Sequence, residues 1–513
     1  MIYKTGSSNI IPSDYPDLDV IRVNNTYYMV STTMHFMPGC VILRSYNLLD
    51  WEFCTYVYDE LDCTSGQKLS DNKGIYGKGM WAATLRYHKN KFYIIFVAND
   101  THKTYLFTSS EITGPWEKKE IQGFYHDVSL FFEEDDTPYL IYGNTDIHIT
   151  EMEKNLLKPK ENGLNKIIIS DNRDEIILGY EGCHFYKING KYYGFFIHMP
   201  KGKMRTEACF VSDRIDGNYT GGDVLCSDLN NWNSGVAQGG IVQSSDGKWY
   251  GILFQDHGAL GRIPVLVPVD FNNEFPVFGE NSIAVSECTV IENNPDYEYA
   301  PLYGNNFLDK NGKLNSWWQW NHIPEKKLIS FKENEFSITT DKTVKNVVQA
   351  ANTLTQRTFS EECGATVEMD VSDIEEGDYA GFCALEGEYG FIGLTKKDGK
   401  IKLVTASHSI PYSPWTMNVY DDDLPDILYE ENFTSSKIKL KMDFSLHYNS
   451  EQVVFSYFNN EKNEFVSVGN PVKLRYTLDQ FVGVRFALFC YSTKNCGGRA
   501  VFKNFEIYVN KDL

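Results

Sequence analysis

Several features that would point to a function are scarce or absent in this chain of 513 residues. Its 11 cysteines are scattered, odd in number and without a C-x-x-C pair, so we expect neither a disulfide framework nor a zinc site. No run approaches the ~18 consecutive apolar residues of a membrane-spanning helix. The first residues also lack the apolar segment of a secretory signal. These absences predict a cytoplasmic protein with reduced thiols.

Positive charge is also in short supply. Lys and Arg total 48 against 69 Asp and Glu, which gives a net charge of −21, and the basic residues form no stripe. A polyanion would be repelled rather than attracted, so nucleic acid is not an expected partner. Aromatic residues, by contrast, are plentiful, with 33 Tyr, 32 Phe and 9 Trp. They suit the cores of β-sheets and leave some rings to stack on sugars.

What the chain does contain is a short unit that occurs five times. Its clearest copy, residues 181–196, reads as a strand, an Asn-Gly turn and a second strand opened by two aromatics. The final aromatics of the five copies are Tyr28, Tyr93, Tyr139, Tyr193 and Tyr250. Neighbouring copies therefore lie 65, 46, 54 and 57 residues apart. Hairpins repeated at this period, with no helical pattern between them, predict an all-β fold with a five-bladed β-propeller.

One position of the repeat carries the chemistry. It lies twelve residues before the final aromatic in four copies and eleven before it in the first, and is occupied by Asp17, Trp81, Asp127, Glu181 and Gln238. Equivalent positions at the start of each blade converge on the propeller axis, so these side chains should line one funnel. Three are carboxylates, which is enough to hydrolyse an acetal. One protonates the leaving oxygen, another activates water, and the third raises the pKa of the acid.

A second domain is predicted after the propeller. Residues 293–301 contain the Asn, Asp and Pro residues that are typical of a domain boundary. We therefore expect a catalytic propeller at 1–300 and an antiparallel β-sandwich at 301–513. The strands predicted for the sandwich are 335–340, 364–371, 437–444, 453–458 and 501–509. Because the junction is short and lacks a flexible tether, the sandwich should pack on the propeller. Residues 492–499 are either a loop that reaches the funnel rim or an ordinary hairpin.

Several segments resemble glycoside hydrolase family 43. Its four signature blocks are matched by residues 16–22, 81–84, 127–132 and 181–182. Its β-xylosidase and α-L-arabinofuranosidase branch, including the C-terminal sandwich, is matched by residues 238–242, 255–262, 352–359 and 377–381. Leu18 and Ala83 depart from the pattern, since each stands where the family usually has Pro. Both changes bear on the shape of the subsite rather than on the chemistry.

The resemblance implies a role for each acid. Asp17 would be the general base, Glu181 the general acid and Asp127 the group that tunes the pKa of the acid. Asp19, two residues beyond Asp17 on the same strand face, is the alternative base. The implied activity is inverting release of terminal α-L-arabinofuranose, β-D-xylose or both from arabinoxylan oligosaccharides. The two sugars present similar hydroxyl groups to a shallow pocket, so activity on both is expected.

Further residues are candidates for binding the sugar. Phe36, Met37 and Trp81 are expected to wall the subsite, since an apolar ring orients a pentose face, although each is also a candidate for ordinary core. Gln238 is expected to contact the substrate. The resemblance places Arg262 near the substrate too, where it would bind a sugar hydroxyl, pair with a catalytic acid, or do both.

A metal ion and two other functions stay open. The resemblance suggests that His257 holds a hydrated Ca²⁺ or Na⁺ in the central channel, with water as the main ligand because Ca²⁺ prefers oxygen. A non-catalytic carbohydrate-binding propeller is the alternative function, but a binding protein gains nothing from an unpaired buried carboxylate. A propeller scaffold for protein partners would present an aromatic or Arg-rich rim instead of an acidic funnel.

Overall fold

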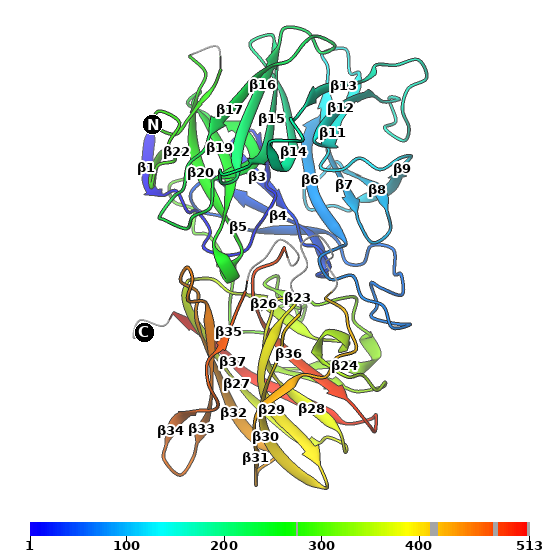
Figure 1. The fold of residues 1–513 in the computed structure, drawn as a ribbon, viewed down its shortest axis with the longest axis vertical. Coiled ribbons are helices and arrows are strands. Elements are labelled where there is room, and N and C mark those ends of the chain that lie inside the picture. Colours follow the sequence, from blue (N-terminus) through cyan, green and yellow to red (C-terminus); the bar gives the residue numbers. More distant parts are fainter. Residues whose placement is uncertain (273–274, 411–418, 476–480, 510–513) are drawn as a thin grey trace.

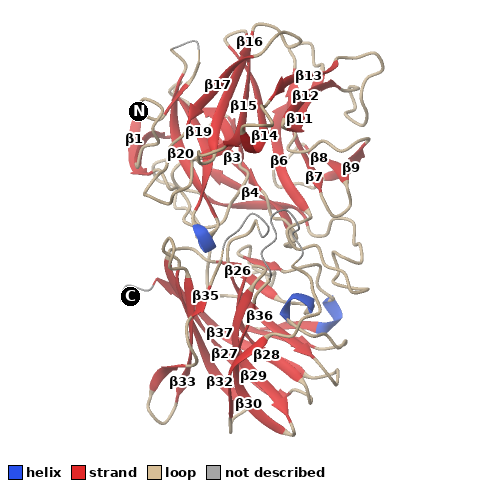
Figure 2. Cartoon of the chain, viewed as in Figure 1, coloured by secondary structure: helices blue, strands red, loops and turns tan. Residues whose placement is uncertain are grey.

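The chain folds almost entirely into strands. A computed structural model describes residues 1–272, 275–410, 419–475 and 481–509. Its helices there are three single 3-10 turns, η1 (Gly258–Leu260), η2 (Lys326–Leu328) and η3 (Val347–Gln349). Two units stack along the long axis, the N-terminal one blue to green and the C-terminal one yellow to red (Figure 1). Strands dominate both units (Figure 2), and no described helix is long and apolar enough to cross a membrane.

The N-terminal unit is the predicted five-bladed propeller. Its five sheets each contain four antiparallel strands that follow one another in the sequence. The blades are β2 (Asp19–Val23), β3 (Thr26–Ser31), β4 (Gly39–Ser45) and β5 (Glu52–Tyr58); β6 (Met80–His88), β7 (Lys91–Ala98), β8 (Lys103–Ser109) and β9 (Glu117–Ile121); β10 (Ser129–Phe132), β11 (Pro138–Asn144), β12 (Asp146–Glu151) and β13 (Asn165–Ser170); β14 (Ile176–Ile188), β15 (Lys191–Pro200), β16 (Thr206–Ser212) and β17 (Thr220–Leu225); β18 (Ala237–Gln243), β19 (Trp249–Asp256), β20 (Arg262–Asp270) and β21 (Val277–Phe278). The first strand of each blade contacts the first strand of the next, and β18 contacts β2, which closes the ring. Outside the blades, β1 (Ile2–Ser7) pairs with β22 (Glu287–Glu292).

The hairpin turns have the backbone that the repeat predicts. Asn189 and Gly190 join β14 to β15 with φ of 51° and 82°, and Lys89 and Asn90 join β6 to β7 with 48° and 59°. Positive φ at both central residues is the geometry of the type I′ turn, which Asn and Gly adopt most readily. The turn residues thus fix the strand register of each hairpin. This register determines which side chains of the first strand face the propeller axis.

The C-terminal unit is a sandwich of two antiparallel sheets. One has the order β23 (Trp318–Trp320), β26 (Leu354–Arg357), β36 (Arg485–Ser492), β28 (Asp378–Leu385), β29 (Tyr389–Lys397), β30 (Lys400–His408) and β31 (Asp426–Asn432). The other has the order β24 (Ile329–Lys332), β25 (Glu335–Thr339), β37 (Arg499–Val509), β27 (Glu362–Asp373), β32 (Lys437–Ser445), β33 (Gln452–Asn459) and β34 (Glu464–Ser467), with β35 (Val472–Lys473) on β33. All five strands predicted for this unit lie in the second sheet.

The two units meet through backbone bonds and a shared apolar core. Met37 and Trp320 exchange backbone hydrogen bonds of 3.0 and 2.7 Å. Arg357 donates from Nε to the carbonyl of Asp14 at 2.8 Å, and its guanidinium lies 4.4 Å from the centre of the Tyr15 ring. One cluster of buried apolar side chains includes members of both units. Separating the units would expose this core to water.

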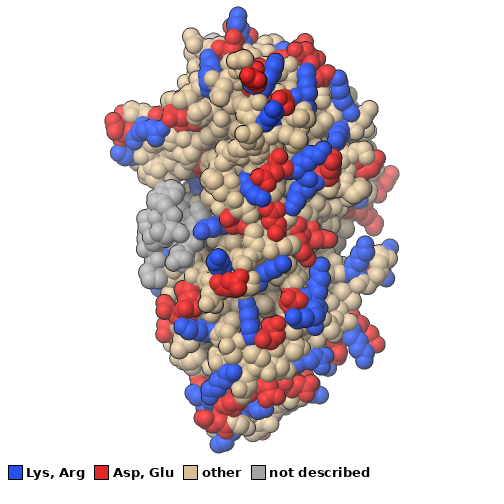
Figure 3. All heavy atoms as spheres, turned by 90° about the vertical axis from the view of Figure 1, so that its right-hand side faces the viewer, with Lys and Arg blue, Asp and Glu red and all other residues tan. Residues whose placement is uncertain are grey.

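The outer surface carries both signs of charge. On the face shown in Figure 3, Lys and Arg side chains are interspersed with Asp and Glu over both units, and no continuous basic patch forms there.

Candidate active site

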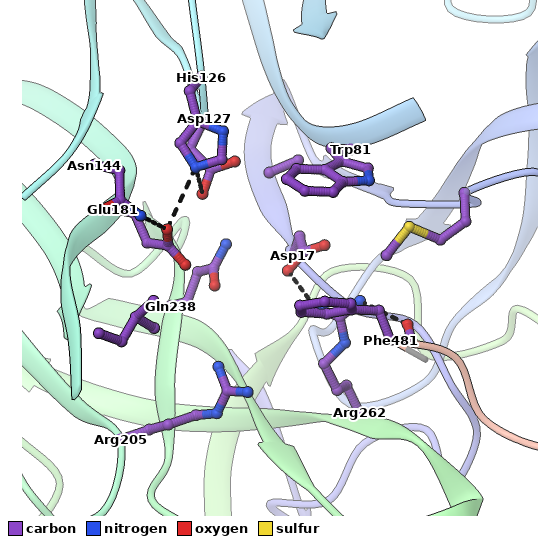
Figure 4. Close-up of a pocket in the computed structure, with 13 residues that line it drawn as sticks. Asp17, Trp81, His126, Asp127, Asn144, Glu181, Arg205, Gln238, Arg262 and Phe481 are labelled. Carbon is purple, nitrogen blue, oxygen red and sulfur yellow. Dashed lines mark hydrogen bonds and ion pairs between the residues drawn. The ribbon is translucent and has the colours of Figure 1, made fainter. Parts of the chain in front are cut away.

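A cavity of about 190 Å³ opens where the first strands of the five blades meet (Figure 4). The side chains that line it are Asp17, Met34, Trp81, Ala82, His126, Asp127, Asn144, Leu178, Glu181, Arg205, Gln238, Arg262 and Phe481. The five repeat-equivalent residues are all among them. The structure thus brings together the side chains that the repeat spacing predicts to converge.

The backbone at these positions departs from regular strand. Asp17, Asp127 and Gln238 adopt φ of 53°, 48° and 57°, a left-handed conformation that is uncommon outside glycine. The pairing of β14 with β15 shifts register on both sides of Glu181, and such bulges re-aim side chains. Gly182 follows with φ of 63°, and a Cβ there would lie 2.6 Å from Gln238 Cγ. Unusual backbone of this kind is concentrated at functional sites.

One side of the cavity holds Asp17 with Arg262. Nη1 of Arg262 lies 2.7 Å from Oδ1 of Asp17, and both side chains are buried. Burial raises the pKa of Asp17 above its usual value, while the guanidinium of Arg262 opposes that rise. Nη2 of Arg262 donates to the backbone carbonyl of Phe481 at 3.1 Å. Of the two contacts considered for Arg262, the structure contains the ion pair, which is made with Asp17.

The other side holds Glu181, Asp127, His126 and Asn144. Nε2 of His126 lies 3.3 Å from Oε2 of Glu181 and 3.7 Å from Oδ2 of Asp127. The side-chain amide of Asn144 donates to the same Oε2 of Glu181, and the backbone N–H of Gly182 donates to Oδ2 of Asp127 at 3.0 Å. Figure 4 shows this group opposite Asp17.

The pKa values on this side are coupled. Burial raises the pKa of Asp127 to about 7, with the carboxylates of Glu181 and Asp17 acting in the same direction and His126 opposing them. Burial disfavours the charged form of His126, but Asp127 and Glu181 raise its pKa to about 9. Near neutral pH His126 is therefore mainly protonated, and Asp127 is protonated in part.

The apolar wall of the cavity combines both units. Met34, Trp81 and Leu178 come from the propeller, and Phe481, which precedes β36, comes from the sandwich. The rings of Trp81 and Phe481 are 6.2 Å apart and tilted by 38°. Residues 492–499, the loop considered for this part of the rim, instead bond within the sandwich, with the N–H of Gly497 on the carbonyl of Thr340 at 2.8 Å.

Two residues predicted to wall the subsite lie elsewhere. Phe36 is 2% exposed and packs with Met34, and the centre of its ring lies 3.3 Å from the guanidinium carbon of Arg485. Met37 is 1% exposed and is joined to Trp320 by the backbone bonds between the units. Both side chains therefore belong to core clusters, Met37 to the one that the two units share and Phe36 to a small one with Met34 and Val482.

Asp19, the alternative base, does not line the cavity. It is fully buried, its Oδ2 accepts from the backbone N–H of Leu85 at 2.8 Å, and it pairs with Arg86. Burial would raise the pKa of Asp19, but Arg86 and His184 hold it near 2. Its contacts tie the first blade to the second and fourth, which is a structural role.

His257 does not have the surroundings of a carboxylate-bound cation. Its Nε2 lies 2.9 Å from Oε1 of Gln255, and its ring stacks on Trp232 at 4.1 Å. Gln255 donates its amide N–H groups to Asp228 and Ser234, so Oε1 accepts from His257 and only Nδ1 keeps a lone pair. Burial lowers the pKa of His257 to about 3. The ring is thus neutral. Among the described residues, His257 belongs to no group of three or more His, Cys, Asp or Glu ligand atoms, so a cation at Nδ1 would take most of its ligands from water.

Known proteins provide the context for this geometry. A family-wide profile described as glycosyl hydrolases family 43 matches residues 7–276. A second profile, described as the beta xylosidase C-terminal Concanavalin A-like domain, matches residues 307–508. The gap between the two matches, residues 277–306, contains β21 and β22 and ends before β23.

Individual relatives cover much of the chain. It is 26% identical over 442 residues to a β-xylosidase of Formosa agariphila, which is 75% of this chain and 74% of that protein. It is 24% identical over 310 residues to a non-reducing end α-L-arabinofuranosidase of Bacteroides ovatus, 57% of either chain. A structure titled bifunctional GH43-CE of Bacteroides eggerthii superposes with a TM-score of 0.89 at 35% identity. That superposition covers 100% of this chain and 64% of the other.

Proposed function

The chain belongs to glycosyl hydrolases family 43, and on that premise we propose that it is an inverting exo-glycoside hydrolase acting on terminal α-L-arabinofuranose, β-D-xylose or both in arabinoxylan oligosaccharides. The observation that carries the proposal is the placement of Asp17, Asp127 and Glu181, from three different blades, around one small cavity. Two buried carboxyl groups, Asp17 and Asp127, beside the partly buried Glu181 are costly, and hydrolysis of an acetal gives each of the three a task.

The tasks follow from the contacts. Asp17 takes a proton from the attacking water, and Arg262 holds its carboxylate in place through the 2.7 Å ion pair. Glu181 gives its proton to the leaving oxygen from the opposite side (Figure 4). Asp127 is the third carboxyl group, and it lies beside the acid and shares His126 with it, which suits the role of modulator. Inversion requires the base and the acid to stand ~6.5–9.5 Å apart, with room for the water between them.

The size of the cavity favours attack at chain ends. At about 190 Å³ it lies below the ~300–1,000 Å³ usual for ligand pockets. Trp81 and Phe481 narrow it with apolar surface, against which a sugar ring can stack. A single pentose suits this space better than the interior of a chain does. The relatives named as β-xylosidase and α-L-arabinofuranosidase support a pentose as the sugar released.

Kinetics on 4-nitrophenyl β-D-xylopyranoside and 4-nitrophenyl α-L-arabinofuranoside test the activity, and we expect turnover of both. Proton NMR of the first sugar released should show the anomer opposite to that of the substrate, whereas retained configuration would refute the role of Asp17. Xylohexaose should yield xylose as its first product. Binding of the sugars without any turnover would instead identify a non-catalytic carbohydrate-binding propeller.

A further inference from the structure

His126 lines the cavity, but the scheme of base, acid and modulator gives it no task. Its Nε2 is 3.3 Å from Oε2 of Glu181, and Asn144 donates to the same oxygen. Figure 4 shows both donors on one side of the carboxyl group, while the second oxygen of Glu181 points into the cavity. The two oxygens of the acid therefore have different surroundings.

The direction of the Asn144 amide is set by its neighbour. Oγ1 of Thr145 donates to Oδ1 of Asn144 at 2.9 Å, so the NH₂ group faces Glu181. The backbone N–H of Thr145 in turn donates to the carbonyl of Tyr180 at 2.8 Å, which ties this corner of the third blade to the strand of Glu181. Asn144 is thus a donor held in place by its surroundings.

We propose that His126 and Asn144 are positioning residues that keep Oε2 of Glu181 as a hydrogen-bond acceptor and thereby confine the acid proton to Oε1. The inference rests on the proposed role of Glu181 as the general acid. A carboxylic acid carries one O–H, and an oxygen that accepts two N–H groups is the less favourable place for it. The proton then lies on the oxygen that faces the substrate.

With this arrangement, every bond that breaks in the chemical step is matched by one that forms. The O–H bond at Oε1 of Glu181 breaks, the glycosidic oxygen gains the proton, and the bond between that oxygen and the anomeric carbon breaks. The water oxygen bonds to the same carbon and gives its proton to Asp17. His126 and Asn144 keep their protons throughout, because their role is to orient the acid.

His126 also balances charge at the site. The acidic groups that act on it are Asp127 next to it in the sequence, Glu181 on β14, and Asp17 ahead of β2. Trp81 presents an aromatic ring at 5.7 Å. With a pKa of about 9, His126 is a cation at neutral pH and offsets the charge of Asp127. Removing this cation takes a positive charge away from a cavity that holds three carboxyl groups, which makes loss of a proton from the site less favourable.

The test compares substrates with different leaving groups. For His126→Leu we expect kcat/KM on xylobiose or an arabinoxylan oligosaccharide to fall ~10- to 100-fold, part of the ~10²–10⁴ that general acid catalysis supplies. A 2,4-dinitrophenyl glycoside needs little protonation and should lose less than about threefold. The alkaline limb of the kcat profile should move to higher pH. His126→Gln, which keeps an N–H donor, should recover much of the oligosaccharide activity, and Asn144→Ala should show the same substrate pattern as His126→Leu.

His198 provides the matched control. Its ring lies between Asp171 and Asp223 at 2.9 and 2.8 Å in the fourth blade, outside the cavity. We expect His198→Gln to leave the ratio between the two substrate classes unchanged. If His126→Leu loses both classes equally with no movement of the alkaline limb, the positioning role is wrong. If Glu181→Gln also shows no leaving-group dependence, the proposed acid itself is wrong, so the two failures are distinguishable.

Discussion

The two sides of the cavity are assembled in different ways. On the acid side, the partners of Glu181 come from the preceding blade, with His126 55 residues and Asn144 37 residues away in the sequence. On the base side, Arg262 is 245 residues from Asp17, and Phe481 is a further 219 residues along the chain. The acid side is thus a contact between neighbouring blades. The base side requires both closure of the propeller ring and docking of the sandwich.

Asp14 shows how the base side depends on the second unit. Its Oδ1 accepts from the backbone N–H of Arg262 at 2.9 Å, and its Oδ2 accepts from the N–H of Gly483 at 3.0 Å. One buried carboxylate thus links the first blade, the fifth blade and the segment that carries Phe481. Changes in the sandwich should therefore impair activation of water and leave the acid unaffected. Leaving-group dependence separates the two, since only the acid side acts on the leaving oxygen.

The largest effect is expected from Asp17→Asn. Every substrate needs an activated water, so kcat should fall by ~10⁴-fold on oligosaccharides and on 2,4-dinitrophenyl glycosides alike. Steady-state kinetics on both substrate classes would show this, with the thermal midpoint as a control for folding. A loss confined to the oligosaccharides would contradict the assignment, because that pattern belongs to an acid.

Glu181→Ala should show that contrasting pattern. We expect a loss of ~10²–10⁴ on natural linkages and less than about tenfold on the dinitrophenyl glycoside, whose leaving group departs without a proton. Added azide should not restore activity with retained configuration, as proton NMR of the product can establish. Equal losses on the two substrates would remove Glu181 from the role of acid.

The same contrast explains what could be predicted from the sequence. The three acids were found because each lies eleven or twelve residues before the aromatic that marks its repeat, and the propeller geometry then brings them together. His126 directly precedes Asp127 in the sequence, and this position was the available signal for His126. Asn144 ends the second strand of its blade, and the repeat marks no functional position there. Phe481 lies outside the repeat, so only the fold of the sandwich brings it to the cavity.

The burial pattern explains why the strands of the other sheet of the sandwich were not predicted. The predicted sandwich strands alternate between apolar and polar residues, whereas β36 and its neighbours in the other sheet are buried on both faces. One face packs on the partner sheet, and the other is covered by segments that include Leu69 and Tyr76 of the propeller. A strand buried on both faces has no alternation to detect. Phe36 and Met37 were misplaced for a related reason, since apolar character alone does not tell a core from a cavity wall.

Asp14→Ala tests the link between the base side and the sandwich. We expect kcat/KM to fall ~10-fold by the same factor on good and poor leaving groups, together with a loss of ~2–4 kcal/mol in the free energy of unfolding from two unsatisfied buried N–H groups. Ser13→Ala is the control, since its Oγ donates to the carbonyl of Thr358 across the same junction at 2.7 Å. Ser13→Ala should lower the free energy of unfolding by ~1 kcal/mol and leave kcat/KM unchanged. Leaving-group dependence in Asp14→Ala would mean that the sandwich also supports the acid.

The smallest expected effect is on the pH dependence of stability, which should differ between the acid side and the base side of the cavity. The pKa of Asp127 is about 7 in the folded chain against 3.8 for the unperturbed group, so folding takes up a proton between these values. The stability of the native protein therefore falls as pH rises from about 4 to 7, and is lowest where Asp127 is ionised in both states. Asp127→Asn removes this dependence, and should be more stable than the native protein by ~1–3 kcal/mol at pH 8 and equal to it near pH 4.

Asp17→Asn provides the comparison for that measurement. Asp17 is also buried, but its carboxylate pairs with the buried Arg262, and the substitution removes this ion pair. The gain in stability at pH 8 should therefore be smaller than for Asp127→Asn, or should become a loss. Denaturant unfolding of both variants at pH 4 and pH 8 measures the difference. If Asp127→Asn were the less stable variant at pH 8, His126 would be holding Asp127 as a favourable carboxylate. The acid side would then resemble the base side, with each carboxylate stabilised by its own cation.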